Sequence, residues 1–179
     1  MGHESRGESG KIRLERGEDS RGITAVHVSA FANHPLSQQT EHLIVDELHA
    51  AGALAISLVA EMTGRIVGHI AFSLVTIEGK DLHWYALGPV GVLPELQGQG
   101  IGSSLVRRGL KALQAHGAAG CVLLGEPEFY SRFGFRQCRE LTMEGVPAEA
   151  VLCLPMIGGE PHGHVEHHPS FWVRPRSEA

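Results

Sequence analysis

The sequence has no apolar run of about 18 or more residues, the length that a helix needs to cross a bilayer. It does not open on a signal peptide, and Arg6 stands where a myristoylation site would need Ser or Thr. Lys and Arg form no runs and the formal net charge is −5, so nucleic acid is not an expected partner. We therefore expect a soluble, cytoplasmic protein that does not associate with membranes.

Cysteine is scarce as well. The three cysteines, Cys121, Cys138 and Cys153, form neither a Cys-x-x-Cys pair nor a zinc-ligand spacing. This scatter predicts reduced, partly buried thiols. Cys121 also lies in too apolar a context to be proposed as a covalent relay in catalysis.

Histidines, in contrast, gather near the C-terminus as His162, His164, His167 and His168. A metal site is the alternative interpretation of this cluster. The flanking prolines and glycines favour a loop, and no carboxylate cluster apart from Glu166 completes a ligand set. We expect no metal.

The chain has 179 residues, 42% of them hydrophobic, which suits one domain with a real core. Residues 1–10 are polar and glycine-rich and are expected to be a flexible leader. The domain is expected to span 11–173, followed by a polar tail at 174–179.

Periodicity predicts the elements of this domain. Strands are expected at Lys11–Glu15, Leu54–Glu61, Arg65–Ile77, Leu82–Leu93, Gly120–Leu124, Gly134–Cys138 and, as the last clear strand, Val151–Ile157. Helices are expected from an N-cap at Asp19 to about Ala32, from Ser37 to about Ala51, from the glycines before Ile101 to about His116, and within Glu126–Phe133. The order predicts an α/β (α+β) domain with a mixed, mostly antiparallel sheet flanked by helices.

The most informative stretch runs from Gly88 to Gly102 and reads GPVGVLPELQGQGIG. An apolar strand enters a glycine-rich loop, and an amphipathic helix follows at once. The first turn of a helix has backbone N–H groups without intrahelical partners, at the positive end of the helix dipole. Glycines let a phosphate approach these donors, so the stretch predicts a phosphate-binding loop.

Two common phosphate loops do not fit. The dinucleotide motif needs a glycine where Ser103 stands and an acidic residue about 20 positions on, which is missing. The nucleotide P-loop needs a lysine after the glycines, and none follows. A nucleotide-binding module is therefore a less favoured hypothesis for this chain.

The pattern Gln97-x-x-Gly100-x-Gly102 resembles the pyrophosphate loop of the GNAT superfamily of N-acetyltransferases, which holds coenzyme A. Downstream, Tyr130-x-x-x-Gly134-Phe135 resembles a second element of that family, at the spacing that one helix and one strand require. The sequence of residues 125–130, GEPEFY, further resembles the bacterial YhbS-like branch. That branch usually carries histidine where this chain has Glu126.

The resemblance implies a single GNAT-like (acyl-CoA N-acyltransferase) fold and acetyl-CoA as co-substrate. It implies that the strand at Val90, Gly91 and Val92 holds the pantetheine arm, with a backbone N–H near Val90 or Val92 facing the thioester oxygen. The loop residues implied to hold the pyrophosphate are Gln97, Gly98, Gln99, Gly100, Ile101, Gly102 and Ser103.

Tyr130 is the candidate general acid. The ordinary pKa of a tyrosine, about 10, suits proton donation to a thiolate. The alternative is that Tyr130 serves only as an aromatic residue of the core. The general base is not readable. Candidates that fall on strands or loops are Glu61, His69, His83, Glu126 and Glu128, each with a structural role as its alternative.

These features predict an N-acetyltransferase that moves an acetyl group by direct transfer to a primary amine of a small molecule or peptide. The rival hypothesis is a non-catalytic, regulatory acyl-CoA-binding domain of the same fold. The acceptor amine is not identified by any motif, and the family resemblance makes a homodimer possible.

Overall fold

The computed structural model describes residues 10–175. Apart from Gly10, Arg174 and Pro175, the expected leader and polar tail lie outside the described residues. Within the described part, no helix combines the length and apolar character that crossing a membrane requires.

A seven-stranded sheet forms the centre of the described region, in the order β1-β2-β3-β5-β6-β9-β7. Its strands are β1 (Lys11–Leu14), β2 (Leu54–Met62), β3 (Arg65–Leu74), β5 (Trp84–Val92), β6 (Gly120–Leu124), β7 (Arg136–Gln137) and β9 (Val151–Pro155). Neighbours are antiparallel except for the parallel pair β5 and β6. Because a parallel pair needs a crossover, the helix between them packs back on the sheet. The predicted mixed sheet is confirmed.

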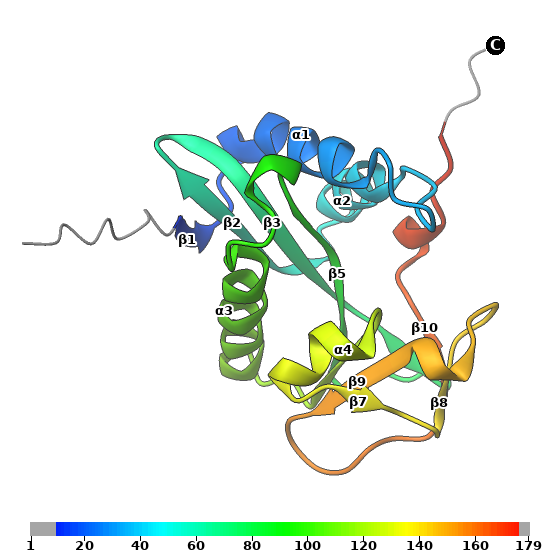
Figure 1. The fold of residues 1–179 in the computed structure, drawn as a ribbon. Coiled ribbons are helices and arrows are strands. Elements are labelled where there is room, and N and C mark those ends of the chain that lie inside the picture. The colour runs from blue at the N-terminus through cyan, green and yellow to red at the C-terminus, as the bar shows by residue number, and fades with distance from the viewer. Residues whose placement is uncertain (1–9, 176–179) are drawn as a thin grey trace, which may run out of the picture.

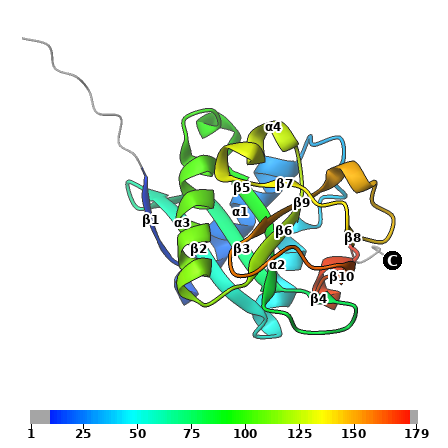
Figure 2. The same ribbon diagram turned by 90° about the horizontal axis from the view of Figure 1, so that it is seen from below.

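Helices cover both faces of this sheet (Figures 1 and 2). Helices α1 (Ser20–Phe31) and α2 (Glu41–Ala50) lie on one face, and α3 (Ile101–Ala115) lies on the other. The short helix α4 (Pro127–Tyr130) follows β6. Along β3, successive side chains point alternately to the face under α3 and to the face under α1 and α2.

Helix α3 approaches the sheet unusually closely. A Cβ atom added at Gly109 would collide with the ring of Phe72 on β3, so only glycine fits at this contact. On the same face, Leu105 and Ile101 pack over Gly68 of β3. His69, between Gly68 and Ile70, therefore points to the opposite face, under α1.

A second, smaller sheet was not expected from the sequence. It has the order β4-β10-β8, formed by β4 (Thr76–Ile77), β10 (Gly163–Glu166) and β8 (Leu141–Thr142). The predicted loop around His164 is thus wrong, and Val151–Ile157 is not the last strand. Strands this short leave no readable periodicity, and their pairing joins segments far apart in sequence.

The second helix begins at Glu41 rather than at the expected Ser37. Gln39 has a φ of 59°, which no α-helix accommodates, and the Ser37 hydroxyl donates to the Glu41 carboxylate instead. Thr63 and Gly64 form the hairpin tip between β2 and β3, with φ values of 48° and 76°.

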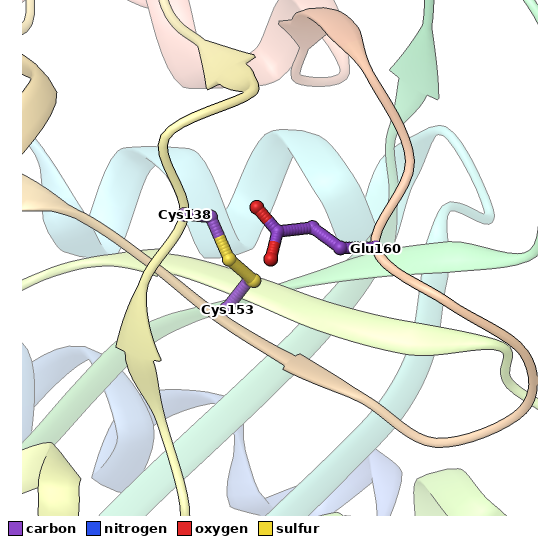
Figure 3. Close-up of side chains that lie close together, drawn as sticks. All are labelled: Cys138, Cys153 and Glu160. Atoms are coloured by element: carbon purple, nitrogen blue, oxygen red, sulfur yellow. A yellow bond between two sulfur atoms is a disulfide. The ribbon is translucent and has the colours of Figure 1, made fainter.

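The cysteine prediction is corrected by the structure. Cys138 and Cys153 form a disulfide, with Cα atoms 5.8 Å apart, and both side chains are fully buried (Figure 3). The reason is topological: β7 pairs with β9 with Arg136 opposite Cys153, so Cys138, two residues further on, lies diagonally across from Cys153 although the two are 15 residues apart in sequence. The carboxylate of Glu160 lies within 4.8 Å of both sulfur atoms. Cys121 is a free thiol and is also fully buried.

Candidate active site

Strands β5 and β6 separate part of the way along their length. They pair only from Trp84 to Ala86 on β5, opposite Gly120 to Val122 on β6. Beyond that point β6 stays paired with β9 as far as Leu124, while β5 continues to Val92 beside β3. The edge of β5 from Leu87 to Val92 is therefore open toward β6. A V-shaped opening results between the two strands.

The register decides which backbone groups face this opening. The N–H of Leu93 donates to Val67 on β3, and backbone direction alternates along a strand. The N–H groups of Val90 and Val92 therefore point away from β3, into the opening. The carbonyl of Val92 points the same way, because it accepts a hydrogen bond from Nε2 of Gln97 at 3.0 Å.

The glycine-rich loop lies directly beyond the end of β5. Gly98 and Gly100 have φ values of 78° and 87°, which explains why glycine stands at both positions. The first helical hydrogen bond of α3 runs from the N–H of Ser104 to Gly100. The N–H groups of the three residues before Ser104 consequently have no intrahelical acceptor. Loop and helix together form a concave group of donors suited to an anion.

Tyr130 stands beside the end of β6, at the rim of the opening. Its ring rests on the backbone of Gly125, where a Cβ atom would lie 2.5 Å from Cε2. The rings of Phe129 and Phe135 contact it edge-on, with centroids 4.9 Å and 5.9 Å away. Burial raises the pKa of Tyr130 to about 12, with a further contribution from Cys121, so the phenol remains a proton donor at neutral pH.

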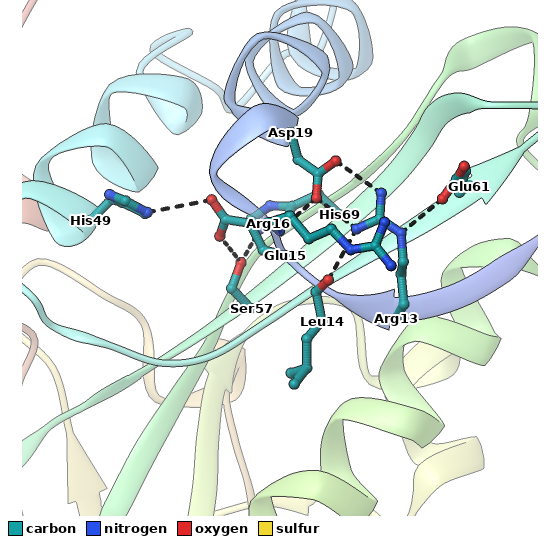
Figure 4. Close-up of polar contacts among 9 residues, drawn as sticks. All are labelled: Arg13, Leu14, Glu15, Arg16, Asp19, His49, Ser57, Glu61 and His69. Atoms are coloured by element: carbon teal, nitrogen blue, oxygen red, sulfur yellow. Dashed lines mark hydrogen bonds and ion pairs between the residues drawn. The ribbon is translucent and has the colours of Figure 1, made fainter.

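The candidate bases have different surroundings. Glu61 accepts a hydrogen bond from Nε of Arg13 at 2.7 Å, and the same guanidinium binds Asp19 (Figure 4). Asp19 is the expected cap position of α1, but its carboxylate binds Arg13 and the N–H of Arg16 instead of capping the helix. The hydrogen bond with Arg13 lowers the pKa of Asp19. We assign Glu61 a structural role in this ion-pair cluster.

The other three candidates with exposed or loop positions divide in two groups. His83 is exposed in a turn at the far end of β5, where its N–H binds Asp81. Glu126 and Glu128 flank the start of α4 and are exposed near the end of β6. Of the three, only Glu126 and Glu128 follow directly after β6, the strand that borders the opening.

His69 belongs to a buried polar chain under α1 that sequence reasoning missed. Its Nδ1 lies 2.7 Å from Nε2 of His27, and its Nε2 lies 2.8 Å from Oγ of Ser57. Ser57 donates to the carboxylate of Glu15, whose other oxygen is 3.6 Å from the exposed His49 (Figure 4). The chain crosses the sheet from β3 to its edge.

The direction of these hydrogen bonds fixes the tautomers. Because Ser57 donates to Glu15, its oxygen accepts from Nε2–H of His69, and Nδ1 of His69 accepts from His27. Nδ1 of His27 is then unprotonated. It is buried without a partner among the described residues, against Gly91 of β5.

Burial lowers the pKa of His27 to about 4, with His42 adding to the effect, and lowers the pKa of His69 well below its ordinary value. Both imidazoles are therefore neutral at pH 7. A signal for His27 was present in the sequence, since it shares the spacing of the inward residues Ile23 and Val26 on α1.

A cavity of about 240 Å³ opens at the last residue of β6. Leu123 joins the core cluster under α3, so the next residue, Leu124, points to the face of α1 and α2. The cavity, which we call the Trp172 cavity, is lined by Leu124, Met143, Glu144, Val146, Glu166 and Trp172, together with part of β10 and the turn after it.

The histidines near the C-terminus have separate partners. His162 contacts Glu140, and His164 contacts Thr142. His168 accepts from the N–H of Ser170 at the start of the 3₁₀ turn Pro169–Trp172, and the ring of His167 packs on Phe171. Among the described residues, these side chains do not converge on one point as a metal site would require.

Comparison with known proteins agrees with this geometry. Residues 53–137 match the family model of the acetyltransferase (GNAT) domain. The chain is 38% identical over 125 residues to the uncharacterized N-acetyltransferase YhbS of Escherichia coli K12, covering 69% of this chain and 72% of YhbS. It is 34% identical over 122 residues to YjhQ of the same strain, another uncharacterized N-acetyltransferase, of which it covers 66%. The chain belongs to the GNAT family of N-acetyltransferases.

Solved structures extend the similarity to nearly the whole chain. A GNAT family acetyltransferase from Brucella melitensis, in complex with acetyl-CoA, superposes with a TM-score of 0.82 at 46% identity, covering 90% of this chain and 97% of that one. YhbS from Escherichia coli, in complex with CoA, gives a TM-score of 0.84 at 32% identity, covering 92% and 93%. The predicted GNAT-like fold and the resemblance to the YhbS-like branch are confirmed.

Proposed function

We propose that this protein transfers the acetyl group of acetyl-CoA directly to a primary amine of a small molecule or peptide. One observation carries the proposal: the open edge of β5 lies between the glycine-rich loop and Tyr130. In this proposal Gln97, Gly98, Gln99, Gly100, Ile101, Gly102 and Ser103 hold the pyrophosphate. The pantetheine arm runs beside Val90, Gly91 and Val92. The acetyl-CoA and CoA complexes of the two structural relatives support this assignment.

The chemistry follows from this placement. The amine nitrogen attacks the thioester carbon, and a backbone N–H of Val90 or Val92 stabilises the charge that develops on the carbonyl oxygen. As the C–N bond forms, the C–S bond breaks and its electron pair leaves with sulfur. Tyr130 donates its proton to the thiolate and is reprotonated from the nitrogen through solvent. Burial disfavours both the phenolate and a neighbouring thiolate, so their proton affinities rise together.

The Trp172 cavity is the place we propose for the acceptor. Its lining includes Leu124, the last residue of β6, whose side chain points to the face opposite α3. In this proposal the amine approaches the thioester from that face. The non-catalytic acyl-CoA-binding alternative is tested by the release of coenzyme A across a panel of amines. Release above the rate without amine supports the transferase. An unchanged rate with every amine supports the binding domain.

Binding of acetyl-CoA tests the loop directly. We expect isothermal titration to give micromolar affinity for acetyl-CoA and no heat with ATP or NAD. Gln97→Ala removes the hydrogen bond that joins the loop to Val92, worth about 0.5–1.5 kcal/mol, so affinity should fall about 2–12-fold.

Gln114→Ala, at the exposed far end of α3, is the matched control and should bind like the wild type. A folded wild-type protein without acetyl-CoA binding would make the loop an ordinary turn and end the proposal. Equal affinities for the two variants would show that Gln97 does not order the loop.

A further inference from the structure

The Trp172 cavity has an uneven distribution of charge. Its carboxylates are Glu144 and Glu166, whereas none of the described residues that line it is Lys or Arg. Neither carboxylate forms an ion pair with another residue in the described range 10–175. Two unpaired negative charges at one small cavity favour a cationic occupant.

Two histidines also line the cavity, and His167 does not offset this charge. His164 and His167 come from β10 and the residue after it. Burial lowers the pKa of His167 to about 4, so this imidazole is neutral at pH 7. His164 is half-buried beside Thr142.

The rest of the lining is apolar and aromatic. Leu124, Met143 and Val146 contribute aliphatic surface, and the side chain of Trp172 is 66% exposed. An indole face attracts a cation, and aliphatic surface packs against a methylene chain. The cavity thus offers separate contacts for a positive group and for a short hydrocarbon arm.

The reacting nitrogen is not the group that these carboxylates hold. A nitrogen attacks the thioester only when it is unprotonated, and a carboxylate beside it would favour its protonated form. The cation in the cavity must therefore be a second group of the same molecule. We infer that the acceptor is an amine carrying a second, protonated amino group a few methylenes away, held by Glu144 and Glu166 beside Trp172. This inference rests on the proposed transferase function.

Three probes of equal length test it. Butylamine, 1,4-diaminobutane and 4-aminobutanoate present a neutral, a cationic and an anionic end to the cavity. Coenzyme A release at a fixed acetyl-CoA concentration should give a kcat/KM about tenfold higher for 1,4-diaminobutane than for butylamine, and the lowest value for 4-aminobutanoate.

Matched variants locate the effect. The double variant Glu144→Gln, Glu166→Gln should reduce the advantage of the diamine over butylamine to about twofold or less. Glu47→Gln, which removes an exposed carboxylate on α2 outside the cavity, should leave the advantage unchanged. Glu166→Lys should shift preference toward 4-aminobutanoate. Each readout is a ratio of substrates within one protein, so a partial folding defect cancels.

The outcomes separate the inference from the proposed function. Turnover of butylamine without a diamine advantage, or an advantage that persists in the double variant, overturns the inference and leaves the transferase standing. If none of the three amines releases coenzyme A, transfer to simple amines fails, and titration of 1,4-diaminobutane into the CoA-saturated protein decides. Binding heat in the wild type that is absent in the double variant supports the cation site. No binding heat in the wild type overturns it.

Discussion

Tyr130→Phe is expected to lower turnover about 100-fold while acetyl-CoA affinity changes less than about twofold. The substitution removes one hydroxyl and keeps the ring that packs between Phe129, Phe135 and Gly125. The loss should fall on kcat, because the proton reaches the thiolate only as the C–S bond breaks. Steady-state release of coenzyme A, together with titration of acetyl-CoA, measures both quantities.

Tyr85→Phe is the matched control, since Tyr85 is the other tyrosine of the chain. It is buried at the start of β5, where its ring packs on His116. We expect this variant to keep wild-type turnover. A Tyr130→Phe protein with full activity would assign Tyr130 to the aromatic core alone. The pKa of about 12 also predicts that wild-type activity shows no loss from Tyr130 ionisation up to about pH 10.

Stability is expected to fall steeply as the pH drops below about 6.5. His27 and His69 stay neutral in the folded protein, because burial lowers both pKa values, whereas the unfolded chain protonates them near pH 6.5. The unfolded state therefore binds more protons from about pH 6.5 down to about pH 4. Each histidine changes the unfolding free energy by up to about 1.4 kcal/mol per pH unit, or about 2.7 kcal/mol for the pair.

Denaturant unfolding at pH 7.5, 6.5 and 5.5 measures this slope. His69→Gln removes one of the titrating groups, so its slope should be shallower by up to about 1.4 kcal/mol per pH unit, whatever its absolute stability. A slope unchanged by His69→Gln would mean that this imidazole titrates alike in the folded and unfolded states.

Local signals predicted the parts of the fold that local chemistry determines. The glycine loop and α3 followed from helix-end rules, and β6 was placed at Gly120–Leu124 as predicted because a short apolar run bounded by glycines is typical of a buried strand. The family resemblance implied that the strand at Val90, Gly91 and Val92 holds the pantetheine arm, but not where this strand separates from β6. Its backbone geometry depends on the register with β3, which no local pattern records.

Long-range contacts account for what was missed. The disulfide depends on β7 lying beside β9, and the spacing of Cys138 and Cys153 contains no trace of that pairing. His27 and His69 meet because α1 packs over β3, a contact that no local pattern in the sequence records. The Trp172 cavity likewise gathers residues from the end of β6 and from the C-terminal region. Sequence position alone did not relate them.

The contact of Gly109 with Phe72 has a consequence for cofactor binding. A helix that rests directly on a ring of the sheet has little freedom to slide or tilt. Its free N–H groups, just before Ser104, are thus held in place before any ligand arrives. Coenzyme A would lose conformational entropy on binding, but the protein would lose little at the start of α3. If the loop holds pyrophosphate as proposed, part of its affinity would come from the rigid contact at Gly109, a residue distant from the phosphate.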